Sequence, residues 1–209
     1  MKDLSQTALL AIDVQIDFCP GGALAVSEGD AVVGPINDLL PRFGVRVLTQ
    51  DWHPKDHSSF AANHPGSEPF SVIDMPYGQQ VLWPVHCVQG TRGAEFHDQL
   101  NVHAADLVVR KGFRPAIDSY SAFYENDRTT TTGLSGYLRE RGVGDVVLAG
   151  LALDFCVAWS ALDAVAAGFR VTVLEDASRA IDLDGSLERA RADMQAQGVD
   201  LARTADYAA

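Results

Sequence analysis

Short apolar runs alternate along most of the chain with segments whose apolar residues recur at helical spacing. Short continuous apolar runs bounded by turn residues are typical of strands buried on both faces of a parallel sheet. They predict strands at residues 8–12, 45–49, 107–110, 146–149, 169–174 and, at an edge, 199–202. The helical spacing predicts helices at residues 30–43, 132–141, 154–167 and 186–197. This alternation predicts an α/β fold of three layers, in which a mostly parallel six-stranded sheet has helices on both faces.

One long segment, residues 52–92, does not follow this alternation and is rich in proline, glycine, histidine and aromatic residues. A loop of that length inside a compact domain is usually either functional or disordered. Aromatic residues such as Trp52, Phe60 and Trp83 argue against disorder. We therefore expect a single domain over residues 1–209 with one long, ordered and functional loop.

Polar residues whose side chains can take part in catalysis or bind a metal follow the ends of four predicted strands. Asp13 follows the first strand, Asp51 and His53 the second, Lys111 the third and Cys156 the fourth. In parallel α/β sheets, ligands bind beyond the carboxyl ends of the strands. The sequence therefore predicts that these side chains converge on one edge of the sheet.

Cys156 lies where a strand passes through a tight turn into a helix. Asp154 is a candidate N-cap, which places Cys156 in the first helical turn. Unpaired backbone N–H groups and the helix dipole favour a thiolate there, as a nucleophile requires. An ordinary buried cysteine, packed as a small apolar side chain, is the alternative.

Asp13 leaves an apolar strand, so its carboxylate needs a partner. Lys111 is the nearest candidate by topology, and both residues can approach Cys156. A base beside a thiol takes its proton, and an adjacent ammonium stabilises the thiolate. The alternative is a structural ion pair between Asp13 and Lys111.

Asp51 and His53 are two positions apart, so in an extended segment they point to the same side. His86 can add a third group from the far end of the long loop. A carboxylate with two imidazoles suits zinc, iron or manganese. His57 and His64 compete for the same role.

Aromatic residues are spaced around these polar groups and can hold a flat heteroaromatic amide between their rings. They are Phe18, Trp83, Tyr120, Phe123 and Tyr124. For the last two, packing in the core is an equally good explanation.

The composition narrows the class of partner. A net charge of -12 argues against nucleic acids and anionic membrane surfaces, which are bound through lysine and arginine. No apolar run approaches the roughly 20 residues of a membrane span, and the first residues lead directly into a strand pattern. Three cysteines far apart suit a reducing compartment. We expect a cytoplasmic protein that binds a small molecule, and the sequence leaves open whether it forms a homo-oligomer.

Five segments together resemble the nicotinamidase/pyrazinamidase family of the isochorismatase-like cysteine hydrolases, over nearly the whole chain. They are residues 13–18, 51–53, 83–87, 111–112 and 150–157. The combination of Asp-x-His with Trp-Pro-x-His-Cys is similar to the nicotinamidase branch rather than to isochorismatases or N-carbamoylsarcosine amidases.

The resemblance implies an amidohydrolase that converts nicotinamide to nicotinate and ammonia, and pyrazinamide to pyrazinoate, through a cysteine thioester in NAD salvage. It implies Cys156 as nucleophile, Asp13 as general base and acid, and Lys111 as the residue that tunes both. The backbone N–H groups of Ala152 and Cys156 would form the oxyanion hole. Asp51, His53 and His86 would hold one divalent metal ion, with zinc favoured over iron or manganese.

The resemblance also implies several supporting residues. His57 is an extra metal ligand or, like Ser59, a residue that supports the ligands. Phe18, Trp83, Tyr120 and Leu151 would contact the substrate, and the peptide bond between Leu151 and Ala152 would be cis. Two other functions remain open: another amide or carbamoyl hydrolase on the same core, and a non-catalytic, metal-dependent ligand-binding protein.

Overall fold

The computed structural model describes residues 3–207, and its centre is a six-stranded, entirely parallel sheet. The strand order is β5-β2-β1-β6-β7-β8, which confirms the predicted fold class. The strands are β1 (Thr7–Ile12), β2 (Val45–Asp51), β5 (Leu107–Lys111), β6 (Asp145–Leu151), β7 (Arg170–Arg179) and β8 (Asp200–Ala202).

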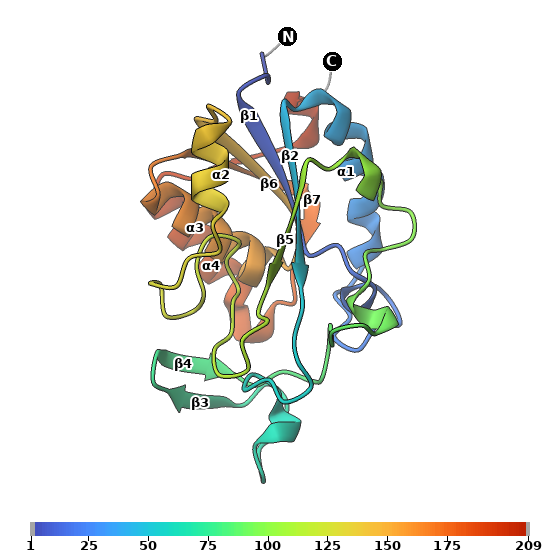
Figure 1. Cartoon of the computed structure of the whole chain (residues 1–209), viewed down its shortest axis with the longest axis vertical. Coiled ribbons are helices and arrows are strands. Elements are labelled where there is room, and N and C mark those ends of the chain that lie inside the picture. Colours follow the sequence, from blue (N-terminus) through green and yellow to red (C-terminus); the bar gives the residue numbers. More distant parts are fainter. Residues whose placement is uncertain (1–2, 208–209) are drawn as a thin grey trace.

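Helices cover both faces of this sheet. They are α1 (Val33–Leu39), α2 (Leu134–Glu140), α3 (Ala158–Ala166) and α4 (Ser186–Ala196). Figure 1 shows α1 on one face and α2, α3 and α4 on the other, which is the predicted three-layer arrangement. The central strand β1 is buried at all six positions because both of its faces are covered, and its residues 8–12 form a continuous apolar run.

The helix predicted at residues 30–43 is shorter than expected. A 3₁₀ turn at Gly29–Val32 precedes α1, and another at Leu40–Arg42 follows it. Pro41 has no backbone N–H to continue the helical ladder, which explains why α1 ends before it. Within residues 3–207, no helix has the length and apolar character needed to cross a membrane.

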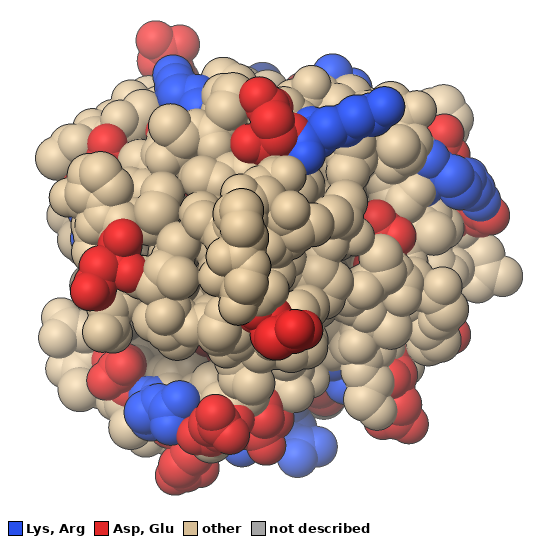
Figure 2. Space-filling view, turned by 90° about the horizontal axis from the view of Figure 1, so that it is seen from below, with Lys and Arg blue, Asp and Glu red and all other residues tan. Residues whose placement is uncertain are grey.

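The long segment predicted to be irregular contains a β-hairpin, so that prediction was wrong in part. Strands β3 (Val72–Met75) and β4 (Gly78–Val81) pair antiparallel across a two-residue turn. The β4 sequence Gly-Gln-Gln-Val lacks the alternating apolar pattern that marks a half-buried strand. In Figure 1 the hairpin lies beyond the carboxyl ends of the sheet strands. Figure 2 looks onto this end of the molecule, where uncharged side chains cover most of the surface.

The connection from β6 to α3 differs from the prediction at Asp154. A π-helical turn at Leu153–Val157 begins α3, its N-cap is Ala152, and no side chain caps it. The Asp154 carboxylate instead accepts hydrogen bonds from the Ile181 N–H at 3.0 Å and the Asp182 N–H at 2.8 Å. Asp154 therefore ties this turn to the segment between β7 and α4. The peptide bond between Leu151 and Ala152 is cis, as the family resemblance implied.

Candidate active site and metal centre

The ends of β1, β2 and β5 and the turn after β6 bring four polar side chains together. The Lys111 Nζ lies 2.8 Å from Asp13 Oδ2, 2.5 Å from Asp51 Oδ1 and 3.5 Å from the Cys156 Sγ. It also donates a hydrogen bond to the Ser119 carbonyl at 2.8 Å. All four side chains are buried, and Lys111 is 1% exposed. An ammonium inserted between two carboxylates and a thiol satisfies the need for paired charges in the interior.

Burial sets the proton affinities of this group. It raises the pKa of Asp13, which makes that carboxylate a stronger base than a solvated aspartate. It also raises the pKa of the Cys156 thiol well above its usual value, although Lys111 opposes the shift. Burial lowers the pKa of Lys111, but the attraction of Asp13 and Asp51 is larger and the net shift is upward. The resting site therefore holds a thiol rather than the thiolate expected from the helix dipole.

Asp13 is held in one orientation by Thr49 on β2. The Thr49 hydroxyl donates to Asp13 Oδ1 at 2.6 Å, and the Asp13 N–H donates to the Thr49 oxygen at 3.1 Å. Asp13 has φ = 46°, in the left-handed region that non-glycine residues seldom adopt. Strained backbone of this kind concentrates at functional sites, where surrounding contacts maintain it.

Asp51, His53 and His86 form a buried cluster whose potential ligand atoms lie within 4.8 Å of one another. Asp51 Oδ2 is 3.4 Å from His53 Nε2 and 3.9 Å from His86 Nε2. The Nδ1 atoms are hydrogen-bonded to backbone carbonyls, that of His53 to Gly112 at 2.8 Å and that of His86 to Pro84 at 2.7 Å. This bonding fixes each ring with Nδ1 protonated and the Nε2 lone pair directed at the cluster, as metal-binding histidines require. These three residues can hold a metal ion.

The protonation states within the cluster differ. Burial and the neighbouring His53 lower the pKa of His86 to about 4, so His86 is neutral near pH 7. For Asp51, burial raises the pKa, but Lys111 and His53 outweigh it and hold the pKa well below the usual range. For His53, burial lowers the pKa, but Asp51 raises it by more. A charged carboxylate beside a neutral imidazole is a suitable pair of metal ligands.

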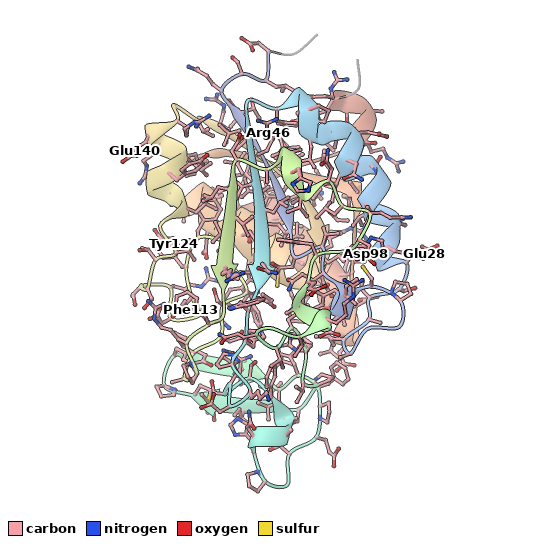
Figure 3. The ribbon with its side chains drawn as sticks, turned by 45° about the vertical axis from the view of Figure 1, so that its right-hand side comes forward. Glu28, Arg46, Asp98, Phe113, Tyr124 and Glu140 are labelled. Atoms are coloured by element: carbon pink, nitrogen blue, oxygen red, sulfur yellow. The ribbon has the colours of Figure 1, made fainter. Side chains whose placement is uncertain are left out.

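The turn after β5 brings its backbone against the cluster. Gly112 has φ = 63°, and a Cβ atom there would lie 2.4 Å from the His53 Cε1. Only glycine allows the carbonyl of residue 112 to reach the His53 ring, because any side chain would push that ring away. Phe113 follows this turn and lies beyond the end of β5 (Figure 3).

His57 lies beside the cluster, but both of its ring nitrogens have other partners. Its Nδ1 is 2.7 Å from the Ser59 hydroxyl, and its Nε2 is 3.1 Å from the Ile117 carbonyl. The His57 and His53 rings are 4.2 Å apart between centroids. In this conformation His57 and Ser59 therefore buttress His53. His64, the other competitor, has its Nε2 2.7 Å from the Ser58 carbonyl.

A cavity joins the cysteine to the histidine cluster. Of the residues predicted to contact a substrate, Phe18, Trp83 and Tyr120 line it, whereas Leu151 is buried but not part of the lining. The complete lining is Phe18, Leu24, Asp51, His53, Trp83, His86, Asp118, Tyr120, Ala152, Phe155, Cys156 and Ile181. Half of the twelve lining residues carry aromatic rings when the two histidines are counted, which suits a flat ring.

Phe123 and Tyr124, for which core packing was an equally good explanation, do not line this cavity. Phe123 is 1% exposed and packs on Phe169 with ring centroids 6.0 Å apart. Tyr124 lies at the edge of the molecule on the side of α2 (Figure 3).

Four lining residues were not predicted from the sequence: Leu24, Asp118, Phe155 and Ile181. Phe155 precedes the cysteine, and its ring is 4.9 Å from that of Trp83 between centroids. Ile181 follows β7, so the rule that ligands lie beyond strand ends could have found it. Leu24 and Asp118 lie in loops and carry no such signal.

Comparisons with known proteins agree with this geometry. Residues 7–206 match the isochorismatase domain family. The chain is 54% identical to a nicotinamidase of Acinetobacter baylyi, over 95% of this chain and 93% of that protein. A solved Acinetobacter baumannii nicotinamidase/pyrazinamidase is 56% identical with a TM-score of 0.97, covering 99% of this chain and all of the other. A pyrazinamidase of Pyrococcus horikoshii solved in complex with zinc is 36% identical with a TM-score of 0.77, covering 95% and 99%. The chain belongs to the nicotinamidase family of isochorismatase-domain hydrolases.

Proposed function

We propose that this protein hydrolyses nicotinamide to nicotinate and ammonia, and pyrazinamide to pyrazinoate, through a thioester on Cys156. The observation that carries the proposal is one cavity with two adjoining groups: the thiol, amine and carboxylate of Cys156, Lys111 and Asp13, and the Asp51 cluster. The first group suits attack on an amide carbon, and the second suits a ring nitrogen held through a metal ion. The family to which the chain belongs supports the same reaction.

The residues at the cluster fit one divalent metal ion, with Asp51, His53 and His86 as its ligands. Zinc is the metal we propose, since it accepts mixed nitrogen and oxygen ligands and leaves positions open. The zinc complex of the Pyrococcus horikoshii relative supports this choice. A metal ion held by these three residues would supply a Lewis-acidic site for the ring nitrogen of the substrate.

Asp13 and Cys156 carry out the first half of the reaction. Because the resting cysteine is a thiol, Asp13 takes its proton as the sulfur attacks the carboxamide carbon. The Lys111 ammonium, 3.5 Å from the sulfur, stabilises the negative charge during transfer. The backbone N–H groups of Ala152 and Cys156, both at the cavity wall, hold the oxyanion.

The second half reverses these roles. The C–N bond breaks, and Asp13 gives its proton to the departing ammonia, leaving a thioester between the acyl group and Cys156. Asp13 then takes a proton from an incoming water molecule, whose oxygen attacks the thioester carbon. The C–S bond breaks, Asp13 returns the proton that it took from water to the departing sulfur, which restores the thiol of Cys156, and the carboxylic acid loses its own proton to solvent.

The test combines an ammonia-release assay with elemental analysis of the purified protein. Cys156→Ala should release no ammonia from nicotinamide while keeping its metal, because the sulfur is not one of the proposed ligands. Cys19→Ala is the matched control, since Cys19 is a buried cysteine outside the cavity lining. Substantial ammonia release by Cys156→Ala would refute the nucleophile. A wild-type preference for N-carbamoyl amines over nicotinamide would favour the carbamoyl hydrolase alternative.

A further inference from the structure

The β3–β4 hairpin contributes one fully buried polar side chain, that of Gln80 on β4. Its neighbours on the strand, Gly78 and Gln79, are exposed, and Val81 is half-buried. An amide buried on an otherwise exposed hairpin is costly unless its donors and acceptor find partners. The partners of Gln80 therefore indicate why a polar group stands at this position.

The Gln80 amide joins residues that line the cavity. Its Nε2 carries two N–H groups and has three acceptors within hydrogen-bonding distance: the Val81 carbonyl at 2.7 Å, Asp118 Oδ2 at 2.8 Å and the Tyr120 hydroxyl at 2.9 Å. Its Oε1 accepts from Asn126 Nδ2 at 3.2 Å and from the Tyr77 hydroxyl at 3.2 Å. A carboxylate accepts but does not donate, so the nitrogen side of the amide must face Asp118. This fixes the orientation of Gln80.

The same network sets the position of two aromatic walls of the cavity. The Tyr120 hydroxyl accepts a second hydrogen bond from Trp83 Nε1 at 3.1 Å. Asn126, which donates to Gln80, also accepts from the Tyr120 backbone N–H at 3.0 Å. The Trp83 and Tyr120 rings are perpendicular within 13°, with an interplanar angle of 77° and centroids 6.2 Å apart. Gln80 thus holds the hydroxyl that links these two rings.

We infer that Gln80 is a positioning residue for substrate binding, acting through Asp118, Tyr120 and Trp83. The inference rests on the proposed function, because the ring it would help to seat is that of nicotinamide. Gln80 has no hydrogen bond to Asp13, Lys111 or Cys156 among the contacts of residues 3–207. Its loss should therefore weaken binding of the ring and leave the chemical step nearly unchanged.

The experiment measures kcat and KM for nicotinamide in the metal-loaded enzyme. Gln80→Glu replaces the donor with a carboxylate that faces Asp118, and we expect KM to rise about tenfold or more with kcat within about threefold of wild type. Gln80→Met removes the hydrogen bonds without adding charge and should raise KM in the same direction. Gln79→Glu, next along the strand and exposed, adds the same charge and should leave both constants unchanged.

A double variant in which the amide and the carboxylate exchange places tests whether Gln80 acts through Asp118 or only through the stability of the hairpin. In Gln80→Glu with Asp118→Asn, an amide and a carboxylate again face each other with their places exchanged. The KM increase of this double variant should be about tenfold smaller than the product of the two single increases. Multiplied effects would mean that Gln80 and Asp118 act independently of each other, and that result would overturn the inference.

Two further results are decisive. Folded Gln80→Met and Gln80→Glu variants, judged by thermal unfolding, that keep the wild-type KM would overturn the inference while leaving the proposed function intact. A wild-type enzyme that releases no ammonia from nicotinamide would instead remove the proposed function, and the inference with it.

Discussion

Replacing Lys111 with methionine removes the only ammonium from a buried group that holds two carboxylates. Lys111 Nζ lies 2.8 Å from Asp13 Oδ2 and 2.5 Å from Asp51 Oδ1, and its side chain has no exposed surface. Methionine keeps a similar length and fills the space without charge. The substitution therefore tests the electrostatic role of Lys111 with little change in packing.

The magnitude follows from these distances. At an effective dielectric constant of about 20, each attraction is worth about 6 kcal/mol. Desolvation of the ammonium offsets several kcal/mol of this sum. Removing one partner of a buried ion pair typically costs about 3–5 kcal/mol, because an unpaired charge stays in the interior. We expect a loss in this range, equivalent to a fall in Tm of about 6–20 °C for a chain of this length.

The loss should depend on pH. In the wild type, Lys111 opposes the upward shift of the Asp13 pKa that burial causes and helps to hold the Asp51 pKa below its ordinary 3.8. Without Lys111 both pKa values rise, so the folded variant binds protons more tightly than the unfolded chain. Stability of the variant relative to the wild type then falls as pH rises above about 4. The deficit should be largest near pH 7 and shrink towards pH 4.

The assay is urea unfolding of both proteins from pH 4 to pH 7, with a chelator present so that no cation replaces the lost ammonium. Lys55→Met is the matched control, since it makes the same substitution at an exposed lysine. A deficit below about 1 kcal/mol, or one of equal size at pH 4 and pH 7, would refute the electrostatic reasoning.

Three further substitutions test other contacts. Gly112→Ala should lower metal affinity at least tenfold in metal titrations, because the added Cβ would lie 2.4 Å from the His53 Cε1 and displace that ring. An unchanged metal affinity would contradict this packing. Asp51→Ala should remove the metal and raise KM for nicotinamide, and a purified variant with stoichiometric metal by elemental analysis would disprove the ligand set. Asp154→Ala should lower the free energy of unfolding by about 1–3 kcal/mol in urea, because the Ile181 and Asp182 N–H groups and the buried Ser186 hydroxyl lose their acceptor. A loss below about 0.5 kcal/mol would count against this role of Asp154.

The parts of the fold that the sequence predicts best are those in which one local pattern determines the structure. Residues 8–12 of β1 are an unbroken apolar run because both sheet faces are covered, so pattern and burial coincide. The positions of Asp13 and Lys111 follow from the same logic, since a parallel sheet gathers its carboxyl ends at one edge. Neither inference depends on the loops.

The hairpin and its contribution to the cavity could not be predicted in this way. Gln80 is buried by contacts with Asp118 and Asn126, which are distant in sequence and themselves lie in loops. A glutamine between Gln79 and Val81 carries no local sign of burial, because the hydrogen bonds that permit it are formed only after the loops have folded. For Asp154, tertiary contacts with Ile181 and Asp182 likewise outweighed its local preference for the N-cap.

The sequence presents a cysteine group and a metal group as separate motifs, but Asp51 unites them. Its Oδ1 receives Lys111 at 2.5 Å, and its Oδ2 faces His53 and His86 at 3.4 and 3.9 Å. The Asp51 carboxylate thus contacts both the Lys111 ammonium, which lies beside the cysteine, and the candidate metal site formed with His53 and His86. A cation bound at Oδ2 would weaken the attraction between Asp51 and Lys111. Lys111 would then interact more strongly with Asp13 and with the Cys156 sulfur. We therefore expect metal binding at this cluster and the reactivity of the cysteine to be linked through the Asp51 side chain.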